Sequence, residues 1–161
     1  MTETFTDFLR DRAAKYNAKR ADRDAVVAEW REALAQLYDR LRRCLSNADP
    51  DGILTVTEGQ RKINEQGLGV YTVPSLNIDG LGEWVGIVPK ARYTVGTVTP
   101  PQKSTPERAA GRVDITDEVR RYILYRVSGG GGDTWLIDDT NGNVKPLDDA
   151  TFLDALKSYL R

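Results

Sequence analysis

Apolar residues recur at alternating steps of three and four in the first third of the chain, and we call them the seam. They are Val27, Trp30, Leu34, Leu37, Leu41 and Cys44. This spacing keeps one face of an α-helix apolar. It predicts a long amphipathic helix whose apolar face must be covered by another part of this chain or by a partner.

The predicted helix covers residues 3–46, which contain neither Gly nor Pro and are rich in helix-forming residues. Traced toward the N-terminus, the seam meets Arg20 and Arg23, so its apolar character is interrupted. Two interpretations follow: one helix of about 60 Å with a polar middle, or two helices broken near residues 17–24. We favour one helix, because no residue in that segment forces a turn.

Residues 47–52 are expected to end this helix. Pro50 cannot continue a helix, Gly52 accepts a positive φ, and the Asn and Asp side chains can bind their own backbone. This boundary predicts a helical arm over residues 1–46 and a second region over residues 47–161.

The second region has the pattern of an antiparallel sheet. Short runs rich in β-branched and aromatic residues alternate with Gly, Asp and Asn turns. Strands are expected at residues 53–57, 70–73, 76–78, 84–88, 91–98, 113–115, 120–127, 134–138 and 144–147. The segments 84–88 and 91–98 are either one strand bent at Pro89 or two strands. Surface loops are expected at 99–110, which holds three prolines, and at the glycine-rich segment 128–133.

A last helix is expected near residues 150–160, with Phe152, Leu156 and Leu160 buried. The predicted fold class is therefore α+β: a long N-terminal helix, an antiparallel sheet of about six or seven strands, and a C-terminal helix packed on the sheet.

Composition narrows the chemistry. Among 161 residues there is no histidine and one cysteine, and the net charge is −1. The missing histidine excludes Ser-His-Asp and Cys-His nucleophile systems and histidine-bound metals. We expect no cofactor, do not favour an enzyme, and infer a cytoplasmic location because Cys44 has no disulfide partner. No apolar run approaches the roughly 20 residues that span a bilayer, so no membrane association is expected.

The seam makes protein–protein interaction the leading hypothesis. It predicts a non-catalytic assembly module that works as a homo-oligomer or as a subunit of a larger complex. The partner would be a second copy or another protein, bound through the N-terminal helix as in a coiled coil. The expected partner-binding residues are Val27, Trp30, Leu34, Leu37 and Leu41. The other interpretation is that the seam packs on the sheet of its own chain.

Nucleic-acid binding is a second hypothesis. Basic residues lie on or beside the expected strands, with tyrosines nearby, and such a sheet face can hold phosphates and stack bases. These residues are Arg61, Lys62, Lys90, Arg92, Arg120, Arg121 and Arg126. The near-neutral net charge does not favour it.

Calcium binding is a third hypothesis. The segment with Asn47, Asp49, Asp51 and Glu58 resembles an EF-hand loop in its spacing of oxygen ligands, with Gly52 at the turn. Against it, Asn rather than Asp opens the loop, Ser46 precedes it, and residues 55–57 favour a strand. The plainer interpretation is a turn that ends the helix.

Overall fold

The chain folds as the α+β protein that its pattern predicts. The computed structural model describes residues 2–94, 97–101, 106–129 and 132–161. In chain order, the elements are α1 (Phe5–Ala48), β1 (Thr55–Glu65), β2 (Gly69–Gly80), β3 (Glu83–Ala91), β4 (Gly111–Thr116), β5 (Arg121–Gly129), β6 (Gly132–Asp138), β7 (Val144–Pro146) and α2 (Asp149–Leu160). The seven strands form one antiparallel sheet in the order β1 to β7, so each strand pairs with its neighbours in sequence.

Helix α1 is a single helix, as favoured over two. It begins after Thr4, whose hydroxyl accepts a hydrogen bond from the Asp7 N–H at 3.1 Å. It ends where the Asp49 N–H binds the Leu45 carbonyl. The Asp49 carboxylate then accepts the N–H groups of Ile53 and Leu54, at 2.9 and 2.8 Å, and turns the chain toward β1.

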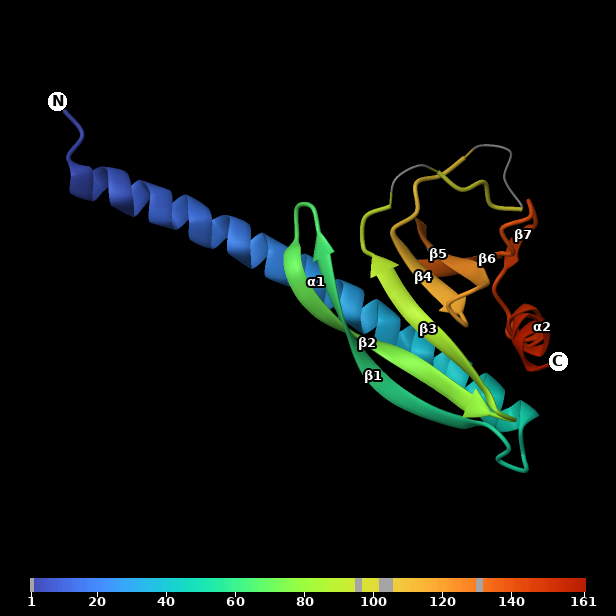
Figure 1. Cartoon of the computed structure of the whole chain (residues 1–161). Coiled ribbons are helices and arrows are strands. Elements are labelled where there is room, and N and C mark those ends of the chain that lie inside the picture. The colour runs from blue at the N-terminus through green and yellow to red at the C-terminus, as the bar shows by residue number, and fades with distance from the viewer. Residues whose placement is uncertain (1, 95–96, 102–105, 130–131) are drawn as a thin grey trace.

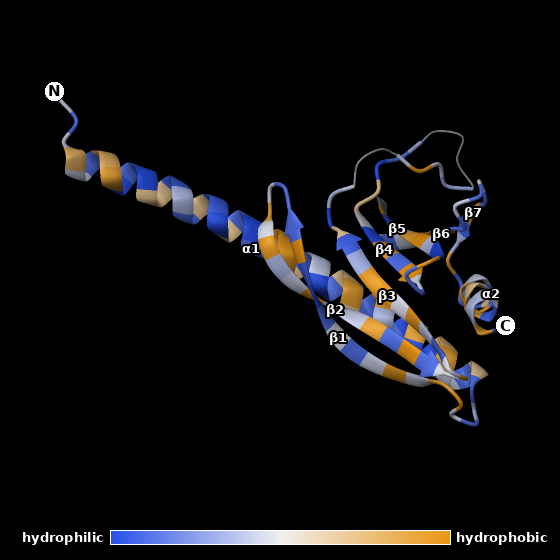
Figure 2. Cartoon of the chain, viewed as in Figure 1, coloured by the Kyte–Doolittle hydropathy of each residue, from blue (hydrophilic) through white to orange (hydrophobic). Residues whose placement is uncertain are grey.

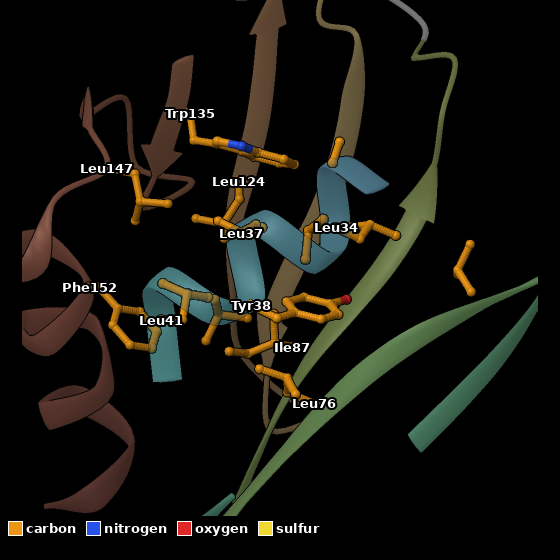
Figure 3. Packing of buried hydrophobic residues seen from close by; sticks show 14 of the residues in the cluster. Leu34, Leu37, Tyr38, Leu41, Leu76, Ile87, Leu124, Trp135, Leu147 and Phe152 are labelled. Carbon is orange, nitrogen blue, oxygen red and sulfur yellow. The ribbon is translucent and has the colours of Figure 1, made fainter. Parts of the chain in front are cut away.

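The sheet curves around the C-terminal half of α1, while the N-terminal half projects beyond it (Figure 1). All the seam residues lie in the core, with side chains at most 7% exposed. Trp30 stacks on Trp135 of β6 with ring centroids 6.3 Å apart. Figure 3 shows Leu41 of α1 beside Phe152 of α2, so the second helix closes the end of the same core. The expected burial of the seam is confirmed.

Helix α2 is fixed by its first turn. Asp148 and Thr151 form a reciprocal capping box. Phe152 and Leu156 are buried as expected, whereas Leu160 is half-buried. The Tyr159 hydroxyl donates to the Ile115 carbonyl at 2.8 Å and ties this helix to β4.

Several expected strand bounds are wrong. Strand β1 continues through polar residues to Glu65, and the two strands expected at 70–73 and 76–78 are one continuous strand, β2. The described residues of the segment 91–98 do not form the expected strand. Strand β3 ends at Ala91, and Val98 forms only an isolated bridge with Glu107. Parts of the three expected features at 91–98, 99–110 and 128–133 lie outside the described residues, at 95–96, 102–105 and 130–131.

Candidate functional site

The most exposed element is the N-terminal part of α1, residues 5–22, which we call the arm. Every residue in it is exposed. Figure 2 shows it as mainly hydrophilic, with hydrophobic residues gathered near its N-terminal end. Phe5, Phe8 and Leu9, the arm tip, are 74%, 45% and 49% exposed, and the two phenylalanine rings stack with centroids 6.2 Å apart. Tyr16, two turns further along the helix, is 58% exposed.

Charge is distributed unevenly along the arm. Residues 2–11 carry three acidic side chains and one basic side chain, whereas residues 12–23 carry five basic and one acidic. The pair Lys15–Asp11, with nitrogen and oxygen 3.1 Å apart, joins the two parts. The arm therefore has an acidic, apolar end and a basic end next to the sheet.

A groove lies where the arm meets the sheet, and we call it the basal groove. Its volume is about 470 Å³, and its walls come from α1, from Leu68 in the turn between β1 and β2, and from the start of β2. It is lined by Tyr16, Arg20, Arg23, Val27, Leu68 and Val70, among others. Val70 is 56% exposed, so the groove combines basic side chains with accessible apolar surface.

Of the five residues expected to bind a partner, Val27 alone lines the basal groove. Val27, Trp30, Leu34, Leu37 and Leu41 are buried against the sheet of their own chain, with 0–7% of their surface exposed. The seam therefore packs within its own chain, which is one of the two interpretations that the sequence allows. A partner would have to dock on another surface. The seam pattern did not identify the exposed apolar residues of the arm tip.

Four of the seven predicted nucleic-acid residues come together. Arg61, Lys90, Arg120 and Arg121 line a second groove of about 340 Å³, which we call the outer groove, together with Trp84. Trp84 was placed in a strand by the sequence but was not identified as a site residue. Lys62 is exposed but does not line this groove.

The other two predicted basic residues, Arg92 and Arg126, lie around Glu29 of α1. Arg126 is 4% exposed and forms ion pairs with Glu29 and Asp133, the latter at 2.8 Å. The Arg92 side chain lies 3.7 Å from the Glu29 carboxylate and donates to the Ala110 carbonyl at 2.9 Å. These two guanidinium groups are therefore occupied in holding α1 and the segment before β4 to the sheet.

The Glu29 pair makes stability depend on pH. The hydrogen bond from Arg126 lowers the pKa of the Glu29 carboxyl below its ordinary value of 4.5. A group with a lowered folded-state pKa stabilises the fold above its unfolded-state pKa, and this contribution is lost as pH falls through the folded-state value. Because the Glu29 side chain is half exposed, the contribution is expected to stay below about 1 kcal/mol.

We therefore expect Glu29→Gln to be less stable than the wild type at neutral pH, with a difference that shrinks on acidification to about pH 3. Urea unfolding across this range measures it. Glu32→Gln, at an exposed carboxylate on the same helix, is the matched control. A difference that stays constant with pH would contradict the assignment.

The residues of the calcium hypothesis are not brought together around a common point. Asn47 lies in the last turn of α1, and Asp49 uses its carboxylate to bind the backbone of the following turn. Glu58 lies in β1, 3.5 Å from Arg42. Among the described residues, no group of three or more Asp, Glu, Cys or His side chains is arranged to hold a metal ion.

Potential nucleophiles and acids in the core have structural partners. Burial raises the pKa of the Cys44 thiol to about 11, so at neutral pH it is a protonated thiol. Burial also raises the pKa of Tyr38 and Tyr71, whose hydroxyls donate to the Pro74 carbonyl and the Glu65 carboxylate. These groups stabilise the fold through hydrogen bonds and packing.

Comparison with protein-family models, with curated proteins and with solved structures gave no match to this chain. Within the described residues, neither helix has a stretch both long and apolar enough to cross a bilayer.

Proposed function

We propose that this chain is a non-catalytic assembly module that pairs with a second copy of itself through the arm. The observation that carries the proposal is the exposure of the arm as a continuous helix with an aromatic tip, while the seam is already covered by the sheet. A helix without tertiary contacts is marginally stable in water at this length. A partner that buries the arm would supply the missing stabilisation.

The charge distribution favours a second copy as that partner. If two arms lie antiparallel, the acidic end of each faces the basic end of the other. Such a pairing has two-fold symmetry, in which the same surface of both copies is used. Along residues 5–22 the two helices would share about 27 Å of length.

The basal groove supports the same arrangement. In an antiparallel pair, the arm tip of one copy lies near the basal groove of the other. The tip offers Phe5, Phe8 and the carboxylate of Asp7, and the groove offers Arg20, Arg23 and the exposed surface of Val70. Both the apolar and the charged parts of the tip therefore have counterparts in the groove, and each pair would contain two such contacts.

Sedimentation equilibrium over a concentration range tests the proposal. The wild type is expected to be dimeric at tens of micromolar, and the double variant Phe5→Ser/Phe8→Ser is expected to be monomeric, because the tip no longer buries aromatic surface. Val119→Ser is the matched control, since Val119 is 89% exposed in the turn between β4 and β5, away from the arm. A wild type that stays monomeric at these concentrations would overturn self-association.

Charge reversal tests the antiparallel orientation. Asp7→Arg and Arg20→Asp are each expected to weaken the dimer, because each places like charges opposite one another. Combined in one chain, the two substitutions are expected to restore much of the association, because the opposite charges face each other again. If the combined variant is weaker than both single variants, the arms do not pair in this orientation.

A further inference from the structure

The outer groove lies across β1, β3 and β4 and the start of β5. Arg61 comes from β1, Trp84 and Lys90 from β3, and Arg121 from β5. Strands β3, β4 and β5 are neighbours in the sheet, whereas β2 lies between β1 and β3. The groove volume of about 340 Å³ falls within the usual range of ligand pockets, about 300–1,000 Å³.

Basic side chains dominate the groove. Arg61 and Lys90 are exposed, and neither side chain has a hydrogen bond or ion pair to another residue in the described parts of the chain. The two acidic side chains in the lining are Asp114 and Glu118. Asp114 is 1% exposed, and Arg112 binds both of its oxygens, at 2.9 and 3.1 Å. Arg112 therefore compensates the charge of Asp114. The Arg121 guanidinium lies farther from this carboxylate, at 3.9 Å.

Trp84 presents an aromatic surface to this basic groove. Its indole N–H donates to the Asn77 side chain at 3.1 Å, which fixes the orientation of the ring. A Cβ atom at Gly86 would lie 2.6 Å from two atoms of the ring, so the ring lies across the strand in the space that glycine leaves. Part of the ring is therefore packed against the strand at Gly86. Trp84 is half-buried and lines the groove.

From this arrangement we propose that the outer groove binds single-stranded nucleic acid. A base would stack on Trp84, and the adjacent phosphates would be held by Arg61, Lys90 and Arg121. Stacking on aromatic side chains combined with backbone phosphate contacts is how single strands are bound without sequence preference. A duplex does not present an unstacked base to the ring, so binding to single strands is expected to exceed binding to duplex of the same length.

Fluorescence anisotropy of a labelled oligothymidylate at low salt measures the affinity. Lys90→Glu and Trp84→Leu are each expected to weaken binding about tenfold, through loss of a phosphate contact and of stacking. Lys62→Glu is the matched control for charge, because Lys62 is exposed on β1 beside Arg61 but lies outside the groove. This variant is expected to bind like the wild type.

Intrinsic fluorescence gives an independent readout of stacking. Trp30 and Trp135 are at most 6% exposed, so quenching by the unlabelled oligonucleotide would report on Trp84. The quenching is expected to disappear in Trp84→Leu. No binding by the wild type at low salt, or equal weakening by Lys62→Glu and Lys90→Glu, would overturn the proposal, and so would tighter binding to duplex.

Discussion

Replacing Trp30 with alanine is expected to lower the free energy of unfolding by about 3–5 kcal/mol, because it removes a large, fully buried side chain from the centre of the core. The indole stacks on Trp135, and the Arg126 guanidinium lies 6.0 Å from the ring centre. Losing it leaves a cavity between α1 and β6. Urea unfolding of the wild type and the variant measures the difference.

The Trp30 ring occupies the space beside Gly111 where a side chain would begin. A Cβ atom at Gly111 would lie 2.5 and 2.6 Å from two atoms of the Trp30 ring, so Gly111→Ala requires the ring to move. We expect this variant to lose about 1–3 kcal/mol in the wild-type background. In a Trp30→Phe background the same change should cost less, because the smaller ring leaves room for the methyl group.

The coupling between these two positions is obtained from the four-member mutant cycle. Equal effects of Gly111→Ala in both backgrounds would show that the glycine is needed for a reason other than the indole. Val119→Ser serves as a control for the unfolding measurements, since changes at exposed sites usually stay within about 0.5 kcal/mol.

The helices and the fold class could be predicted because their patterns are local. The 3.6-residue period of the seam identifies a helix, and the residues of the 47–52 turn identify its end. Strand β1 was cut short because Gly59, Gln60 and Arg61 lack β-branched or large apolar side chains. These residues join the ladder because β2 offers partners at Ser75, Pro74 and Val73, and a single-sequence pattern contains no information about that pairing.

The candidate site was harder to predict, because an apolar seam has the same pattern whether it packs within a chain or between chains. The apolar face of α1 between residues 27 and 45 is buried in the core, so the exposed apolar residues of this helix lie at the arm tip, where three residues are too few for a periodic signal. The outer groove was predicted in part, since four of its basic residues were identified from the sequence. Trp84 was missed because the place of its ring depends on the space that Gly86 leaves in the folded strand.

The regular strand ends at Ala91, and beyond it a side chain of β1 binds the backbone in place of a neighbouring strand. Glu65, at the end of β1, is 9% exposed, and its carboxylate accepts the Arg92 and Tyr93 N–H groups at 2.9 and 2.6 Å. The Tyr71 hydroxyl donates to the same carboxylate at 2.6 Å. A side chain thus binds the two backbone N–H groups that follow β3, which satisfies them where the regular strand has ended.

Glu65→Ala is therefore expected to lower the free energy of unfolding by about 3 kcal/mol, because three donors in a largely buried position lose their acceptor. Glu65→Gln retains one acceptor oxygen and should lose less. Asn64→Ala, at the exposed neighbouring position of β1, is the control and should change stability little. Hydrogen exchange adds a local readout: the Arg92 and Tyr93 amides should exchange faster in Glu65→Ala, while the amides of α2 change only in proportion to global stability. Unchanged exchange at both amides would show that the carboxylate does not hold this segment in solution.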